Sequence, residues 1–238
     1  MVARPTILLL HGFTQTGRSW DPVVAALAER YRALAPDLRG HGSAADARPI
    51  DFERVHADLL ALAPERFALV GYSMGGRIAL GLALAASERV ERLVLVGASP
   101  GLSDAGERRA RRAADEALAD RIEREGIEAF AREWAALPLW EGQPLEVAAA
   151  ADALRRAQSP SAIAAALRGL GLGAMDPLWD RLGELTMPVA LVAGERDGKF
   201  RALAEQMAGA IPGASVHVVP GAGHAAQLEA PAAVAALL

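Results

Sequence analysis

The stretch Gly71-Tyr72-Ser73-Met74-Gly75 decides how this chain is expected to fold. It matches the pattern G-x-S-x-G, follows an apolar run of strand length (67–72), and precedes a segment with helical spacing (74–86). A serine on such a sharp turn is held in a strained backbone conformation, and the flanking glycines give the chain room to turn. We therefore predict that Ser73 is the catalytic serine; the alternative is a glycine-rich turn with an incidental serine.

Around this turn, apolar runs of strand length alternate with segments of helical spacing. Strands are expected at 6–10, 32–36, 67–72, 90–96, 189–193 and 215–219. Helices are expected at 20–30, 52–62, 74–86, 200–211 and from about Pro231. This order predicts an α/β fold with a mostly parallel sheet, right-handed crossovers and helices on both faces.

The segment 100–181 differs from the rest of the chain. It is rich in Ala, Arg and Glu, it has no strand-like run, and helical stretches are expected at 105–124, 127–137 and 163–170. We predict a core at 1–99 and 182–238 with a helical lid at 100–181, because an insertion at the carboxyl edge of such a sheet lies over the ligand crevice. An inert helical extension is the alternative.

The composition narrows the possible functions. Of the 238 residues, 52% are hydrophobic and 23% are charged, so the chain can bury a large core. The formal net charge of −4 gives no general attraction to nucleic acid or to an anionic membrane, and we expect neither partner. The chain has no cysteine, which excludes disulfides, thiolate catalysis and cysteine metal sites. No segment has the pattern of a signal peptide. We expect a cytoplasmic monomer or weak homo-oligomer that uses no cofactor and no metal.

The segment His11-Gly12-Phe13 follows the first expected strand. In α/β hydrolases the loop at this point supplies one oxyanion donor, and the residue after the nucleophile supplies the second. We therefore predict that the backbone N–H groups of Phe13 and Met74 form an oxyanion hole. His11 is expected to brace the loop.

His224 is the predicted general base. It lies in Gly221-Ala222-Gly223-His224 after the last expected strand, and the chain order serine, acid, histidine is that of the α/β hydrolases. The other four histidines fall in positions less suited to this role: His11, His41, His56 and His217.

Asp197 is the predicted acid of the triad. Both Glu195 and Asp197 follow the strand expected at 189–193, and Asp197 lies further into the loop that faces the crevice. Its role is to hold the imidazole tautomer and to stabilise the imidazolium. Glu195 is expected to cap or to pair with Arg196. Weaker alternatives for the acid are Asp176 and Asp180.

Arg77 lies one helical turn after Ser73, and side chains on a helix lean toward its N-terminus. Its guanidinium can therefore approach the pocket and form two hydrogen bonds to a carboxylate. The alternative is an arginine paired with an acidic neighbour on the helix surface, and the residues alone do not decide between the two.

Six segments together resemble the family of 2-succinyl-6-hydroxy-2,4-cyclohexadiene-1-carboxylate (SHCHC) synthase, an α/β-hydrolase-fold enzyme of menaquinone biosynthesis. The segments are Leu10–Thr14, Ala35–Gly42, Ser73–Leu80, Trp179–Leu182, Gly194–Phe200 and Pro220–His224. The serine turn and the His-Gly and Gly-His pieces are shared by many α/β hydrolases. Arg77 and the Glu-Arg-Asp-x-Lys-Phe segment are more specific.

The resemblance implies a lyase that eliminates pyruvate from a small polycarboxylate, with Ser73 as a base and the oxyanion hole holding an enolate. It also implies that lid arginines contact the substrate carboxylates. The candidates are Arg111 or Arg112, and Arg155 or Arg156. Tyr72 and Trp134 are candidate pocket walls, and Trp134 fits the core of the lid equally well.

Two other functions remain open at this point. The same triad suits a carboxylester or carbon–carbon bond hydrolase in which Ser73 is the nucleophile. The second of these is a relative without catalytic activity that acts as a binding protein. The complete set of Ser73, Asp197 and His224 argues against it.

Overall fold

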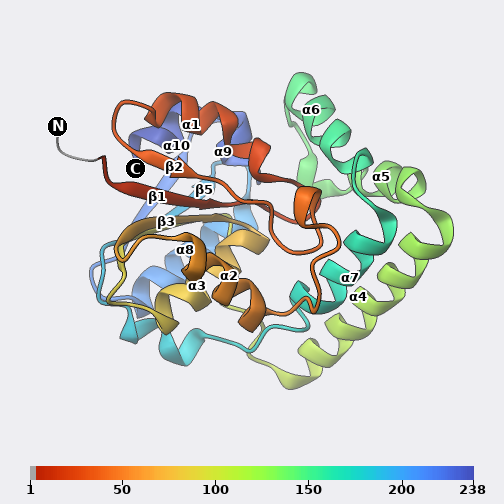
Figure 1. The fold of residues 1–238 in the computed structure, drawn as a ribbon, viewed down its shortest axis with the longest axis horizontal. Coiled ribbons are helices and arrows are strands. Elements are labelled where there is room, and N and C mark those ends of the chain that lie inside the picture. The colour runs from red at the N-terminus through yellow and green to blue at the C-terminus, as the bar shows by residue number, and fades with distance from the viewer. Residues whose placement is uncertain (1–3) are drawn as a thin grey trace.

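The sheet that positions the site has six strands, all parallel, in the order β2-β1-β3-β4-β5-β6 (Figure 1). The computed structural model describes residues 4–238. The strands are β1 (Thr6–Leu10), β2 (Arg32–Leu34), β3 (Phe67–Tyr72), β4 (Val90–Val96), β5 (Val189–Gly194) and β6 (Ser215–Val219). Strands β1, β3 and β5 are buried along their whole length, as expected for a parallel sheet covered on both faces. The α/β-hydrolase fold expected from the sequence is confirmed.

Helices cover both faces of the sheet (Figure 1). They are α1 (Asp21–Leu27), α2 (Phe52–Leu62), α3 (Met74–Ala85), α8 (Gly198–Ala210), α9 (Ala226–Glu229) and α10 (Pro231–Ala236). Because successive strand residues point to opposite faces, Leu8 packs into a core with α2, α3 and α8, whereas Ile7 packs into a second core with α1 and α10. The alternation therefore fixes which helices lie on each side.

Four helices lie between β4 and β5, beyond the carboxyl ends of the strands (Figure 1). They are α4 (Ala105–Glu125), α5 (Ile127–Ala135), α6 (Leu145–Arg156) and α7 (Pro160–Leu170). Three of them, α4, α5 and α7, enclose a small core that includes Ile122, Phe130 and Ile163. Helix α6 was not expected from the sequence. The boundaries at 100 and 181 stay a prediction, and the second falls inside the 3-10 helix Trp179–Glu184.

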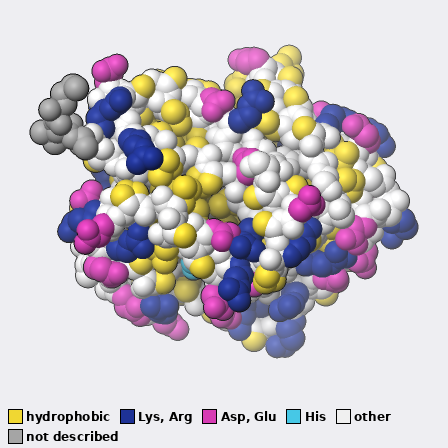
Figure 2. Space-filling model, viewed as in Figure 1, with side chains coloured by type: hydrophobic (Ala, Val, Ile, Leu, Met, Phe, Trp, Pro, Cys, Tyr) yellow, Lys and Arg dark blue, Asp and Glu magenta, His cyan; other side chains and the backbone are white. Residues whose placement is uncertain are grey.

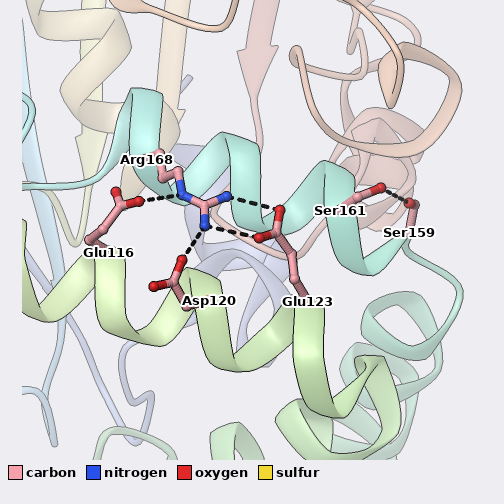
Figure 3. A network of polar contacts seen from close by, with 6 residues as sticks. All are labelled: Glu116, Asp120, Glu123, Ser159, Ser161 and Arg168. Atoms are coloured by element: carbon pink, nitrogen blue, oxygen red, sulfur yellow. Dashed lines mark hydrogen bonds and ion pairs between the residues drawn. The ribbon is translucent and has the colours of Figure 1, made fainter.

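Arg168 of α7 holds α4 in place (Figure 3). Its guanidinium binds three carboxylates on one face of α4: Glu116 at 2.8 Å, Asp120 at 2.6 Å and Glu123 at 2.9 Å. The hydrogen bonds that Arg168 donates to Glu123 are the main cause of a raised pKa for Arg168. Since the carboxylates are half-exposed, each pair adds little alone, and the shared guanidinium makes α4 and α7 one unit.

The surface carries charges of both signs, interspersed over the face drawn in Figure 2. This distribution agrees with the small net charge of −4. No helix within residues 4–238 is both long and apolar enough to cross a membrane.

Candidate active site

The turn between β3 and α3 holds Ser73 in a strained backbone conformation, with φ 51° and ψ −109°. Glycine is required on both sides of it. A Cβ on Gly71 would lie 2.3 Å from the carbonyl oxygen of Gly75, and a Cβ on Gly75 would lie 2.2 Å from the carbonyl oxygen of Leu10. The G-x-S-x-G pattern therefore reflects steric need at both glycines.

The structure brings together the three residues predicted as a triad. His224 Nε2 lies 3.2 Å from Ser73 Oγ, and His224 Nδ1 lies 2.7 Å from Asp197 Oδ2. The second oxygen of Asp197 accepts the N–H of Phe200 at 3.3 Å, at the start of α8, which prevents the carboxylate from rotating. With Nδ1–H donating to Asp197, Nε2 is free to accept the proton of Ser73.

Aromatic rings surround the imidazole of His224. The ring centroids of Phe200, Tyr72 and Trp140 lie 4.5, 5.3 and 5.8 Å from its own. His224 is 3% exposed, so the rings keep bulk water away from the ion pair that proton transfer creates. Trp140, in the 3-10 helix Pro138–Trp140, was not singled out in the sequence because nothing there fixes where this turn lies.

The N–H groups of Phe13 and Met74 have no hydrogen-bond partner within residues 4–238, whereas their neighbours in the first loop do. The N–H of Gly12 donates to Gln15 Oε1 at 3.4 Å, and the N–H of Thr14 donates to His41 Nε2 at 3.3 Å. Met74 is the first residue of α3, where a backbone N–H has no intrahelical acceptor. Both groups are available to a ligand oxygen.

Two buried histidines shape this loop. His11 Nε2 accepts the N–H of Leu38 at 2.9 Å, and its Nδ1–H donates to the carbonyl of Gly12 at 2.8 Å. Burial lowers the pKa of His11 to about 4. Burial, reinforced by His11, lowers the pKa of His41 to about 3. Both side chains are neutral and hold the loop in place, as expected for His11. Neither belongs to the triad.

The other acidic candidates lie elsewhere. Glu195 accepts the N–H of Gly221 at 2.8 Å, so the expectation that it pairs with Arg196 is wrong. Arg196 pairs instead with Glu229, at 2.5 Å. Asp176 is exposed and lines a different cavity.

Ser73 and His224 line a cavity of about 220 Å³ under the helices between β4 and β5. Its other lining residues include Phe13, Tyr72, Met74, Arg77, Arg111, Trp134, Trp140, Lys199 and Phe200. Most of the residues predicted to contact substrate therefore share one cavity. Among residues 4–238, no cluster of three or more His, Cys, Asp or Glu side chains is arranged to hold a metal ion.

Arg77 reaches this cavity and does not pair with an acidic neighbour on its own helix. Its Nη1 donates to the carbonyl of Leu170 at 2.9 Å, at the end of α7. Burial, together with the positive charge of Arg111, lowers the pKa of Arg77 to about 10, and Asp115 partly opposes this shift. Arg77 thus stays charged at neutral pH in a place where the charge is poorly solvated. Such a group favours an anionic ligand.

Two neighbouring arginines of α4 line different parts of the surface. Arg111, which contacts Asp115 at 2.7 Å, lines the cavity, whereas Arg112 lines a separate groove beside Arg168. The structure therefore does not bring Arg112 to Ser73, because adjacent residues on a helix point about 100° apart.

Arg155 and Arg156 of α6 also differ from each other. Arg155 is 5% exposed and contacts Asp152 at 2.9 Å, and its Nε has no partner within the described chain. It does not line the cavity, but its positive charge partly opposes the rise that burial causes in the pKa of Tyr72. Arg156 pairs with Asp152 and Glu128.

Residues 7–237 match the model of the alpha/beta hydrolase family. The chain is 35% identical to the 2-succinyl-6-hydroxy-2,4-cyclohexadiene-1-carboxylate synthase of Klebsiella pneumoniae, covering 98% of this chain and 92% of the relative. It is 36% identical to the enzyme of the same name from Salmonella arizonae, covering 97% and 90%.

Solved structures agree with these relatives. MenH from S. aureus superposes with a TM-score of 0.95 at 31% identity, covering all of this chain and 92% of that one. A thermophilic esterase from Thermogutta terrifontis superposes with a TM-score of 0.85 at 27% identity, covering 99% and 88%. The overall fold is therefore shared with an esterase as well.

Proposed function

This chain belongs to the alpha/beta hydrolase family, in the branch of the 2-succinyl-6-hydroxy-2,4-cyclohexadiene-1-carboxylate synthases, and on that premise we propose that it is a carbon–oxygen lyase of menaquinone biosynthesis. The proposed reaction eliminates pyruvate from 2-succinyl-5-enolpyruvyl-6-hydroxy-3-cyclohexene-1-carboxylate to give SHCHC. The observation that carries it is the half-buried guanidinium of Arg77, which shares one cavity with Ser73 and His224. A triad beside a poorly solvated cation suits a polyanionic substrate.

The bond changes follow from the two ring systems. Conversion of a 3-cyclohexene into a 2,4-cyclohexadiene requires loss of the proton at C2, next to the succinyl ketone. The electron pair of the C2–H bond becomes the C2–C3 double bond, the C3–C4 double bond moves to C4–C5, and the C5–oxygen bond breaks with its electron pair on oxygen. The three-carbon enolate departs and becomes pyruvate when its methylene carbon is protonated. The reaction is redox-neutral, so it needs no electron donor or acceptor.

Proton transfer is the proposed role of the triad. Ser73 Oγ takes the C2 proton as its own proton passes to His224 Nε2, 3.2 Å away. Asp197, 2.7 Å from Nδ1, stabilises the imidazolium. The imidazolium then returns a proton, through Ser73, to the departing enolate. No acyl-serine forms in this scheme.

The oxyanion hole has a matching role. As C2 loses its proton, negative charge develops on the succinyl carbonyl oxygen. We assign its stabilisation to the N–H groups of Phe13 and Met74, which have no other partner within residues 4–238. Donors fixed by the backbone need no reorganisation when the charge appears.

The proposed substrate contacts are made by residues that line the cavity. Arg77 and Arg111 hold carboxylates, and Tyr72 and Trp134 form the walls. Arg155 acts only through its positive charge, which affects Tyr72. Arg112 is not among the proposed substrate contacts because it lines another groove. The helical lid, the cytoplasmic location and the monomeric or weakly oligomeric state stay predictions from the sequence.

The test is pyruvate release. Purified protein is given the enolpyruvyl substrate, and pyruvate is measured with lactate dehydrogenase and NADH. We expect turnover that falls about 1,000-fold or more in Ser73→Ala. Release no faster than in Ser73→Ala would reject the proposed function.

A second candidate is a carboxylester or carbon–carbon bond hydrolase in which Ser73 is the nucleophile. The shared fold with the T. terrifontis esterase favours it. A burst of p-nitrophenol from short esters, equal in amount to the enzyme, would support this alternative because an acyl-enzyme would then accumulate.

A further inference from the structure

Lys199, in the first turn of α8, lines the same cavity as Ser73 and His224 and plays no part in the triad. Its Nζ lies 5.6 Å from the ring centroid of Phe200, and that ring lies 4.5 Å from the imidazole of His224. The side chain is exposed. The ammonium group therefore lies at the open side of the cavity, next to the catalytic histidine.

No carboxylate within residues 4–238 forms an ion pair with Lys199. The acidic residue closest in sequence, Asp197, uses one oxygen for His224 and the other for the N–H of Phe200. Glu195 accepts the N–H of Gly221. The positive charge of Lys199 is thus available to a ligand.

The side chain at position 199 is a lysine and not an arginine, and the two differ in how they bind an anion. Lys199 is the only lysine among the 25 basic residues of this chain. An ammonium is a compact, strongly hydrated charge with three donors, whereas a guanidinium is a wide planar fork. Lys199 therefore offers a ligand near solvent a small charge of a kind that the arginines of the cavity do not.

Positive charge enters the cavity from two different parts of the fold. Arg77 and Arg111 come from α3 and α4, and Arg77 is fixed to the end of α7 through the carbonyl of Leu170. Lys199 comes from α8, on the side of His224. A ligand with a single carboxylate needs one of these groups, and a ligand with carboxylates at separate ends engages both.

We propose that Lys199 binds the carboxylate of the fragment that leaves, a small 2-oxo acid, while Arg77 and Arg111 hold the carboxylates of the ring that stays. This inference rests on the proposed function. The leaving enolate must take a proton from the His224 side, and it must depart while the ring is still bound. A cation that is exposed and adjacent to His224 meets both requirements.

The first experiment uses Lys199→Met with Arg132→Met as a matched control, because Arg132 is exposed on α5 and does not line the cavity. We expect kcat/KM for pyruvate release to fall about tenfold or more in Lys199→Met, and the inhibition constant for added pyruvate to rise by a similar factor. Inhibition by the ring product should change less than about twofold, and Arg132→Met should match the unsubstituted protein. Equal pyruvate inhibition in Lys199→Met and the unsubstituted protein would overturn the inference.

Labelling by a fluorophosphonate separates this effect from damage to the triad. Lys199→Met should label at Ser73 as fast as the unsubstituted protein. Slow labelling together with lost activity would mean that Lys199 supports the triad, and the inference would be wrong.

A second experiment does not depend on turnover. Because Lys199 is the only lysine, trinitrobenzenesulfonate has two amine targets in the chain, Lys199 and the α-amine. We expect sodium pyruvate to slow modification of Lys199, followed by mass spectrometry of the peptide, and to leave the α-amine unaffected. Absence of protection overturns the inference, whereas protection without any pyruvate release would reject the proposed function alone.

Discussion

Glu229 and Arg196 form an ion pair of 2.5 Å that joins the loops of the catalytic acid and the catalytic base. Arg196 directly precedes Asp197. The same Glu229 oxygen accepts the N–H of Gly223, which directly precedes His224, at 2.8 Å. The Glu229 side chain is 3% exposed, so one buried carboxylate sets the spacing of both loops.

We expect Glu229→Gln to lower both activity and stability. The amide keeps the shape but loses the charge, and it cannot accept from Gly223 and Arg196 as strongly. Pyruvate release and fluorophosphonate labelling of Ser73 should each slow by about tenfold or more, with a stability loss of about 1–3 kcal/mol in urea unfolding. The control is Glu184→Gln, since its pair with Arg181 is half-exposed and should add little to stability. Unchanged labelling in a destabilised Glu229→Gln protein would reduce the pair to a purely structural role.

Arg77→Ala should discriminate between charged and neutral substrates. Loss of a half-buried cation that binds a carboxylate should cost about 1.5–3 kcal/mol, a factor of about 10–100 in kcat/KM for pyruvate release. Hydrolysis of a neutral p-nitrophenyl ester should change little. Equal losses on both substrates would mean that Arg77 matters through its hydrogen bond to Leu170 rather than through the ligand.

Arg111 and Arg112 form a matched pair for testing the register of α4. Arg111→Ala should raise KM for the polycarboxylate about tenfold, since Arg111 lines the cavity, and Arg112→Ala should leave it within about twofold. Both substitutions remove one arginine from the same helical turn. A larger effect of Arg112→Ala in steady-state kinetics would show that the helix faces the other way.

The strands, the turn at Ser73 and the triad could be predicted from the sequence because their causes are local or are constrained by the fold. Five of the six predicted strands and the turn at Ser73 lie within one residue of where the structure has them, because apolar runs and obligatory glycines have local causes. The strand predicted at 32–36 ends two residues early, at Leu34. The triad could be proposed because chain order in this fold constrains it.

Helix α6 and the contacts that support the triad could not be predicted in the same way. Helix α6 has alanines at four consecutive positions, 148–151, and these give no apolar period. The choice between Arg111 and Arg112 depends on how α4 packs on α7, and the Glu229 pair joins residues 33 apart in the sequence. Such contacts depend on the tertiary arrangement.

Acid should destabilise the protein through His11 and His41. Their pKa values are about 4 and about 3 in the fold, against 6.5 ordinarily, so the unfolded chain binds more protons once the pH falls below about 6.5. Stability is therefore complete above that pH and falls as the pH drops through 4 toward 3, by several kcal/mol in all. Urea midpoints measured from pH 7.5 to 5 should decrease, and the slope should be smaller in His41→Gln. A flat profile over this range would show that neither histidine is held neutral.

The role of Ser73 as a base is tested most directly by deuterium at ring carbon C2. If Ser73 removes this proton as the pyruvate bond breaks, kcat/KM for pyruvate release should show a primary isotope effect, and the mass of the protein during turnover should stay unchanged. The absence of an isotope effect, together with an added acyl mass on Ser73, would contradict the account and make this serine a nucleophile.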